Sequence, residues 1–251
     1  MYYKKYTTHN SILKSIKLKE KTIKNILKKS NNRYELWCNF IIKNKLKNIS
    51  EIGVYKGDFA AKLLTKCRSI ENYYMIDPWK NLSDWNKPAN HDNEIFESFY
   101  KEALNKTEFA KEKRVILRGK TTEVINQVKN ESIDFVYIDG DHTLKGISID
   151  LINIWDKIKP GGFIAGDDFS PTIWQHSLDF EPTLVFPFAL YFSEAKGVNI
   201  FGLPFNQFLI YKDPIGFNFL DLTNNSYTNT TILSQFSRTT MLKKIIKDFI
   251  T

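Results

Sequence analysis

The sequence has few cysteines and no long apolar run. Its two cysteines, Cys38 and Cys67, are isolated, with no CxxC pair and no Cys/His cluster. A disulfide framework or a structural zinc site therefore has little support. No apolar segment approaches the roughly 20 residues that cross a bilayer, and the first ten residues lack the apolar core of a secretion signal. These absences favour a cytoplasmic protein.

The composition is that of an ordinary globular protein. Of the 251 residues, 42% are hydrophobic and 25% are charged, so neither disorder nor a fibrous class is indicated. A chain of this length can bury a core of several strands and helices, and one main domain with terminal additions is the default expectation. We find no internal repeat.

Charge is distributed unevenly along the chain. The formal net charge is +8, but residues 1–48 hold 13 Lys and Arg against two Glu. Such a segment can attract nucleic acid, an anionic membrane or an anionic acceptor. However, the lysines alternate with Ile, Leu and Asn, which is typical of amphipathic helices with a solvated lysine face. We therefore predict a basic helical N-terminal extension over residues 1–47.

Short apolar runs alternate with helical patterns from residue 48 to residue 212, which predicts βα units and a mostly parallel sheet. Seven runs have the length and composition of strands: Asn48–Val54, Asn72–Asp77, Val115–Arg118, Ser132–Asp139, Phe163–Ala165, Val198–Phe201 and Gln207–Lys212. The intervening helical patterns are Lys56–Lys66, Asn93–Leu104, Thr121–Val128 and Leu144–Ile158. The last two strands are expected to form an antiparallel edge. The pattern predicts a doubly wound α/β domain with a seven-stranded sheet.

Residues 213–251 read as a polar linker followed by an amphipathic helix, Leu233–Ile250. Its apolar side chains alternate with lysines at helical spacing. Packing of this helix onto its own domain is the favoured interpretation. Association into a homo-oligomer and contact with a membrane surface are the alternatives.

Polar residues that could bind a ligand lie where the predicted strands end, which is where open α/β sheets bind ligands. Glu51, Gly53 and Gly57 surround the first strand-to-helix turn. The spacing is not the GxGxxG pattern that holds a pyrophosphate, and the acidic residue suits a cationic cofactor. Asp77 ends the second strand, where a carboxylate can accept both hydroxyls of a ribose.

Two further motifs follow the fourth and fifth strands. The runs YIDGDHTLKG and IKPGGFIAGDD place Asp139, Asp141, Asp167 and Asp168 at adjacent strand ends. With these motifs the segment from Asn48 to Lys212 resembles the class I, S-adenosylmethionine-dependent methyltransferases, which have a Rossmann-like fold, and in particular the O-methyltransferase branch with an IDGDH motif. The resemblance implies a cofactor site made by Glu51, Gly53, Gly57, Asp77, Lys120, Thr121, Asp139 and His142.

Four neighbouring carboxylates repel one another unless a cation or protons intervene. Hard oxygen ligands without cysteine select Mg²⁺ or a similar ion. In the metal-dependent relatives that the sequence resembles, the ligands correspond to Asp139, Asp167 and Asp168. Asp141 is the candidate for the base that deprotonates the acceptor, with His142 and His176 behind it. Alternatively, Asp141 caps the following helix and Asp168 caps a turn.

The sequence thus predicts O-methylation of a sugar or small-molecule hydroxyl with a divalent metal, as in the modification of a surface polysaccharide. Nucleic acid is the less favoured acceptor, because DGDH stands where amino-methylating enzymes carry a D/N-P-P-Y/F motif. A catalytically inactive binding protein with the same fold is the other alternative. Clustered carboxylates count against it.

Overall fold

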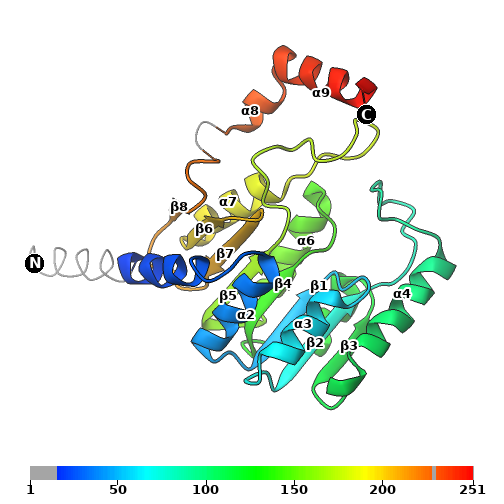
Figure 1. The fold of residues 1–251 in the computed structure, drawn as a ribbon, viewed down its shortest axis with the longest axis vertical. Coiled ribbons are helices and arrows are strands. Elements are labelled where there is room, and N and C mark those ends of the chain that lie inside the picture. Colours follow the sequence, from blue (N-terminus) through cyan, green and yellow to red (C-terminus); the bar gives the residue numbers. More distant parts are fainter. Residues whose placement is uncertain (1–15, 228–229, 251) are drawn as a thin grey trace, which may run out of the picture.

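A computed structural model describes residues 16–227 and 230–250, so the first 15 residues of the predicted N-terminal extension lie outside the described part. Its centre is an eight-stranded sheet in the order β3-β2-β1-β4-β5-β7-β6-β8 (Figure 1). The strands are β1 (Asn48–Ile52), β2 (Asn72–Asp77), β3 (Arg114–Arg118), β4 (Ile133–Ile138), β5 (Ile158–Gly166), β6 (Asn199–Leu203), β7 (Gln207–Tyr211) and β8 (Asn218–Asp221). The predicted doubly wound, mostly parallel α/β fold is confirmed.

The number of strands predicted from the sequence, seven, is wrong by one. The additional strand, β8, pairs in parallel with β6 and forms the edge of the sheet. It lies in the segment that the sequence predicted as a polar linker, because its four residues are too few to show a period-2 pattern. The strand β7 is antiparallel to both of its neighbours, β5 and β6.

Helices cover both faces of the sheet (Figure 1). One face carries α2 (Arg33–Asn44), α3 (Asp58–Lys66) and α4 (Asn93–Lys106), and the other carries α5 (Thr121–Val124), α6 (Leu144–Trp155) and α7 (Val185–Lys196). The apolar side chains of each layer form one hydrophobic cluster with the strand residues beneath them. Such burial on both faces is what makes the central strands read as continuous apolar runs.

The basic N-terminal part is integrated into this core. Residues 16–27 are helical and bury Ile23 and Ile26, while most of their lysines stay in solvent, as the sequence predicts. In α2, Trp37 and Ile41 are fully buried against the sheet. The predicted boundary near residue 48 therefore separates elements that share one hydrophobic core.

Several helices differ from the sequence prediction. The helix predicted to reach Ile158 ends at Trp155, because Ile158 begins β5, and the predicted C-terminal helix is divided into two, Ile232–Gln235 and Arg238–Ile250. Thr121 was expected to cap a helix reaching Val128, but α5 ends at Val124 and continues as the 3₁₀ turn Ile125–Gln127. The Thr121 hydroxyl donates to Asp150 instead of capping. Helix α7 was not predicted from the sequence, since Pro187 interrupts the pattern; the proline lies in the first turn, where its missing N–H costs nothing.

The order of the strands reverses next to β1. From β1 the chain adds β2 and then β3 on one side of the sheet, and it then returns to add β4 and β5 on the other side. A ligand crevice is expected there, outside the carboxyl ends of the strands. At this point the turn after β1 and the end of β4 come into close contact. Gly53 has φ +86°, and a Cβ on it would lie 2.1 Å from the carbonyl oxygen of Asp139. Only glycine fits this position.

No helix within the described ranges is long and apolar enough to cross a membrane.

Candidate functional site

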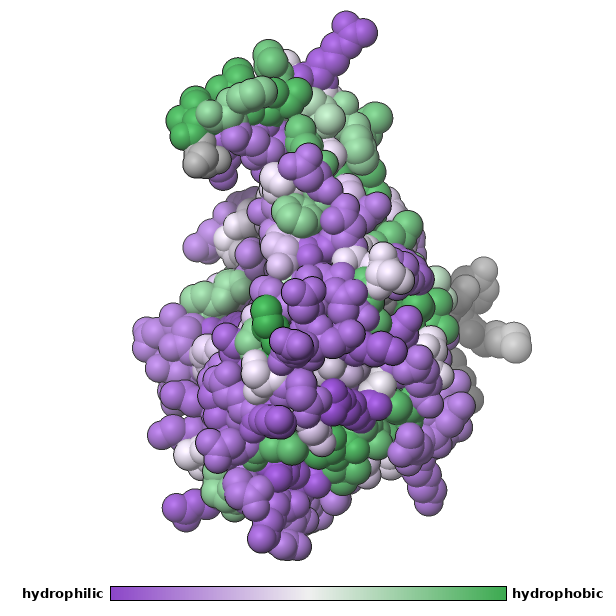
Figure 2. Space-filling model, turned by 90° about the vertical axis from the view of Figure 1, so that its right-hand side faces the viewer, coloured by the Kyte–Doolittle hydropathy of each residue, from purple (hydrophilic) through white to green (hydrophobic). Residues whose placement is uncertain are grey.

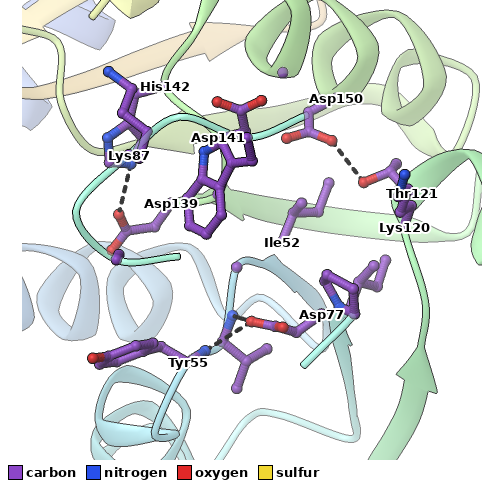
Figure 3. Close-up of a pocket in the computed structure, with 18 of the residues that line it drawn as sticks. Ile52, Tyr55, Asp77, Lys87, Lys120, Thr121, Asp139, Asp141, His142 and Asp150 are labelled. Atoms are coloured by element: carbon purple, nitrogen blue, oxygen red, sulfur yellow. Dashed lines mark hydrogen bonds and ion pairs between the residues drawn. The ribbon is translucent and has the colours of Figure 1, made fainter. Parts of the chain in front are cut away.

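A cavity of about 450 Å³ opens at the carboxyl ends of β1, β2 and β4, a volume within the usual range for small-molecule sites. Figure 3 shows Asp139 and His142 on one side, Asp150 and Thr121 on the other, Asp141 above, and Tyr55 and Asp77 below them. Of the predicted site residues, nine line the cavity: Glu51, Gly53, Asp77, Lys120, Thr121, Asp139, Asp141, His142 and His176. Three do not, namely Gly57, Asp167 and Asp168.

Asp77 organises the turn that follows β1. Its Oδ2 accepts the backbone N–H groups of Val54 and Tyr55, both at 2.9 Å, and its Oδ1 accepts that of Trp79 at 2.7 Å. Burial raises the pKa of this carboxyl, while the three N–H donors oppose the rise. Asp77 therefore fixes the glycine turn and the start of the loop after β2, in addition to lining the cavity.

Glu51 is buried at the floor of the cavity. Its Oε2 accepts the hydroxyl of Tyr73 at 2.7 Å, and burial raises its pKa well above the ordinary value. A buried carboxyl that ionises with difficulty gains from a cationic group placed beside it. Glu51 is thus well suited to a positively charged ligand.

Gly57 lies outside the cavity, at the N-terminus of α3. It has φ +76°, and a Cβ on it would lie 2.8 Å from Cα of Ala103 in α4. This glycine lets α3 and α4 approach each other. A direct contact with a cofactor stays a prediction.

The opposite end of the cavity holds a carboxyl that the sequence did not single out. Asp150 of α6 is buried, and its Oδ1 accepts the Thr121 hydroxyl at 2.6 Å. Burial raises the pKa of Asp150 to about 7, although the hydrogen bond from Thr121 lowers it. The sequence did not indicate that Asp150 belongs to the site, because it lies within α6, after the DGDH motif, on a helix face that is expected to bury apolar residues.

Asp150 makes the stability of the fold depend on pH. In the unfolded chain the carboxyl has its ordinary pKa of 3.8, whereas burial in the folded protein raises the pKa to about 7. The stabilisation is thus fully present below about pH 4 and is lost as pH rises through 7. At roughly 1.4 kcal/mol per pKa unit, we expect the wild-type free energy of unfolding to fall by about 4 kcal/mol relative to Asp150→Asn across this window. Urea unfolding of both proteins at several pH values measures it; parallel stability curves would contradict it.

The acidic cluster at the other end contains two cations from the chain itself. Arg33 Nη1 lies 3.0 Å from Asp139 Oδ2 and also forms an ion pair with Asp167 Oδ2. His142 Nε2 lies 2.7 Å from Asp168 Oδ2 and 3.7 Å from Asp139 Oδ1. Burial lowers the pKa of His142, but the two carboxylates outweigh it and raise the pKa to about 9. At neutral pH, two cations face three carboxylates.

The predicted magnesium ligands do not fit a divalent ion in this arrangement. Asp167 has no free oxygen, because its Oδ1 accepts Gln207 Nε2 at 2.6 Å and the backbone N–H of Asp168 at 2.8 Å, and its Oδ2 pairs with Arg33. The group whose ligand atoms lie within 4.8 Å of one another is Asp139, His142 and Asp168. This group contains an imidazole in place of the third carboxylate, whereas Mg²⁺ prefers oxygen ligands in octahedral geometry, so it is not the ligand set predicted from the sequence.

The three predicted catalytic residues are placed differently. Asp141 accepts both the backbone N–H and the hydroxyl of Thr143, each at 2.9 Å, but the cap of α6 is Thr143 itself, whose Oγ1 accepts the N–H of Gly146 at 3.1 Å; Asp141 holds the capping residue and does not cap the helix. His142 is held as a cation by its carboxylates. His176 lines the cavity, and its pKa is lowered chiefly by burial and further by nearby cations, among them Lys87. Only His176 is a neutral base at neutral pH.

Sequence reasoning missed Arg33 and Lys87. Arg33 is the single arginine among the first 48 residues, and its place in a lysine-rich segment suggested a solvated face. Lys87 is buried beside His176, where Nζ donates to the carbonyl oxygen of Glu181 at 2.6 Å. Both come from segments far along the chain from the residues they meet. No spacing rule links such positions.

Comparison with known proteins gives a domain match and similar folds. Residues 50–169 match a family described as a methyltransferase domain. The fold is similar to that of cofactor-bound Rv0187 from MTB (12% identity, 73% of this chain and 81% of that chain, TM-score 0.53). It is also similar to that of the O-methyltransferase TomG from Streptomyces achromogenes in complex with SAM (14% identity, 71% and 78%, TM-score 0.50). No curated protein matches the sequence significantly.

Proposed function

We propose that this chain, whose residues 50–169 match a methyltransferase domain, is a class I, S-adenosylmethionine-dependent methyltransferase that methylates a hydroxyl oxygen of a sugar or another small acceptor. The observation that carries the proposal is the two-ended cavity, with a neutral histidine and a cationic pair at the end away from Asp150. S-Adenosylmethionine supplies the methyl group from its sulfonium. We propose no step through a metal ion, since Arg33 and His142 already balance two of the three carboxylates.

The residues of the cavity suit this cofactor. In the proposal, Glu51 and Gly53 contact its methionine end, Asp77 its ribose, and Lys120 and Thr121 its adenine. The buried carboxyl of Glu51 favours a cationic ligand, and the bare backbone at Gly53 allows close approach. Asp139 remains assigned to the cofactor site because it lines the cavity beside these groups.

The acceptor is proposed to bind between His176 and the Arg33–Asp139 pair. His176 accepts the hydroxyl proton while the acceptor oxygen forms its bond to the methyl carbon. The cations of Arg33 and His142 stabilise the negative charge that develops on that oxygen. These roles replace those of Asp141 as base and of magnesium as charge stabiliser.

The proposal is tested first at the cofactor site, by isothermal titration with S-adenosylmethionine and S-adenosylhomocysteine. We expect micromolar binding that Asp77→Ala weakens at least tenfold, because the turn after β1 loses two hydrogen bonds and the loop after β2 loses one. The matched control is Asp179→Ala, an exposed carboxylate outside the cavity. Equal affinity in wild type and Asp77→Ala would contradict the proposed cofactor site.

The acceptor class is tested separately. Transfer of labelled methyl groups is measured on sugars, phenols and nucleic acid under the same conditions. Product on hydroxyl oxygens of small acceptors supports the proposal. Turnover on nucleic acid alone would favour the alternative enzyme class, and cofactor binding without any turnover would favour a binding protein.

A further inference from the structure

The C-terminal helices stand apart from the sheet, at the upper end of the molecule in Figure 1. They are α8 (Ile232–Gln235) and α9 (Arg238–Ile250). The attachment is made by α8: Trp174 Nε1 donates to the carbonyl oxygen of Gln235 at 3.0 Å, and the rings of Trp174 and Phe236 lie 5.8 Å apart. The segment that precedes α9 is thus attached to the loop around Trp174, and α9 itself turns Lys244 and Asp248 toward the body.

The apolar face of α9 is turned outward. Leu242, Ile246 and Phe249 follow helical spacing on one side, and they are 58%, 49% and 87% exposed. The inward side carries Lys244 and Asp248, whose side chains are only 11% and 25% exposed and form an ion pair at 2.6 Å. A helix that packs onto its own domain has the opposite orientation. The packing favoured from the sequence is therefore wrong, and nothing among the described residues covers this face.

The surface confirms that the exposed apolar side chains are gathered together. Figure 2 shows hydrophobic residues concentrated at the end of the molecule formed by α8 and α9, above a mostly hydrophilic body. A contiguous apolar patch of this kind on a folded protein marks an interaction surface. Because the patch lies along one short helix, its partner must bind the helix along its length, with the helix axis parallel to the binding surface.

Two partners fit such a face, a second copy of the helix and a lipid surface, and the charge of α9 favours one of them. Of its four basic side chains, Lys244 pairs with the single acidic residue, Asp248, on the inward side, and Arg238, Lys243 and Lys247 leave the helix with a net positive charge. Two copies of the helix packed face to face would bring these positive charges together, which disfavours self-association. An anionic lipid surface attracts the same charges while it buries the apolar side chains. With 13 residues, α9 is about 20 Å long and too short to span a bilayer.

We propose that α9 is an interfacial helix that binds this protein to the surface of an anionic membrane, with Leu242, Ile246 and Phe249 inserted between the lipids. Lys243 lies at the side of the apolar face, where it can reach the headgroups. The loop that holds α8 also carries His176, so the docked helix places the acceptor end of the cavity near the lipid surface. This inference is independent of the methyl acceptor.

The test is co-sedimentation of the full chain with vesicles. One set is phosphatidylcholine alone and the other an equal mixture of phosphatidylcholine and phosphatidylglycerol. We expect binding to the anionic vesicles that weakens with salt, and at least a tenfold loss of partitioning in the double variant Ile246→Asp/Phe249→Asp. Lys243→Glu should weaken binding to the anionic vesicles only.

The matched control is Phe109→Asp, which places the same charge on a phenylalanine that is 61% exposed but lies outside α9. Its partitioning should equal that of the wild type, and titration with S-adenosylmethionine checks that every variant is folded. The proposal is overturned if the wild type stays in the supernatant with both vesicle types. It is equally overturned if sedimentation shows a dimer that the double variant dissociates, because the apolar face then binds a second copy.

Discussion

Replacement of His176 by alanine is expected to lower kcat about 10²–10⁴-fold, the range typical of a lost general base. His176 lines the cavity, and burial keeps its pKa below the ordinary value of 6.5, so the ring is neutral and able to accept a proton at pH 7. Asp141 is occupied by Thr143 and His142 is positively charged, so neither takes over this role. Steady-state kinetics at saturating cofactor measures the loss.

The pH profile distinguishes a base from a packing residue. For the wild type, kcat should be constant at neutral pH and fall with decreasing pH through the pKa of His176, since protonation removes the acceptor of the proton. The variant should lose this acidic limb together with most of the rate. His91→Ala is the matched control, because His91 does not line the cavity. A variant that keeps the acidic limb at a reduced rate would show that another group is the base.

Replacement of Arg33 by alanine is expected to lower kcat/KM about 100-fold and to create affinity for divalent ions. The guanidinium lies between Asp139 and Asp167, so its removal leaves two carboxylates without their counter-charge. The cavity also loses a cation that stabilises developing negative charge. The freed carboxylates match the oxygen ligands that Mg²⁺ and Mn²⁺ prefer. Electron paramagnetic resonance of added Mn²⁺ detects the new site without reference to activity.

Chelation decides between Arg33 and magnesium as the cation of the acidic cluster. Wild-type activity should be insensitive to EDTA, and wild type should bind Mn²⁺ much more weakly than Arg33→Ala. Arg33→Lys keeps the charge but loses the planar fork that contacts both carboxylates, and should retain part of the activity without gaining metal affinity. If EDTA abolishes wild-type turnover and Mg²⁺ restores it, the ligand set Asp139, Asp167 and Asp168 predicted from the sequence is supported instead.

The polar residues at the strand ends could be predicted from the sequence, because the geometry of a parallel sheet fixes where strand ends lie. Residues at the carboxyl ends of neighbouring parallel strands must converge at one edge of the sheet, and Asp77, Asp139 and Asp167 each follow a strand that the apolar pattern indicates. The glycine at position 53 followed from the same logic. Such predictions need only the order of strands, which short crossovers strongly restrict.

Residues that reach the site from elsewhere could not be predicted in this way. Arg33 is 106 residues from Asp139 and approaches from α2, whose packing on the sheet depends on the burial of Trp37 and Ile41. Asp150 lies in the cavity because α6 packs beside it. The helical period predicts which face of α6 is buried, but it does not predict that this face meets the polar side chain of Thr121.

The sequence by itself determined the layered α/β fold, the edge of the sheet that holds the site and the cofactor class, because periodicity and strand-end motifs are local properties. Only the tertiary structure decided which charges neutralise Asp139 and Asp167, which histidine is neutral, and which way the apolar face of α9 points. These depend on contacts between distant segments. Burial and electrostatic pairing act through space, and the order of residues along the chain does not specify them.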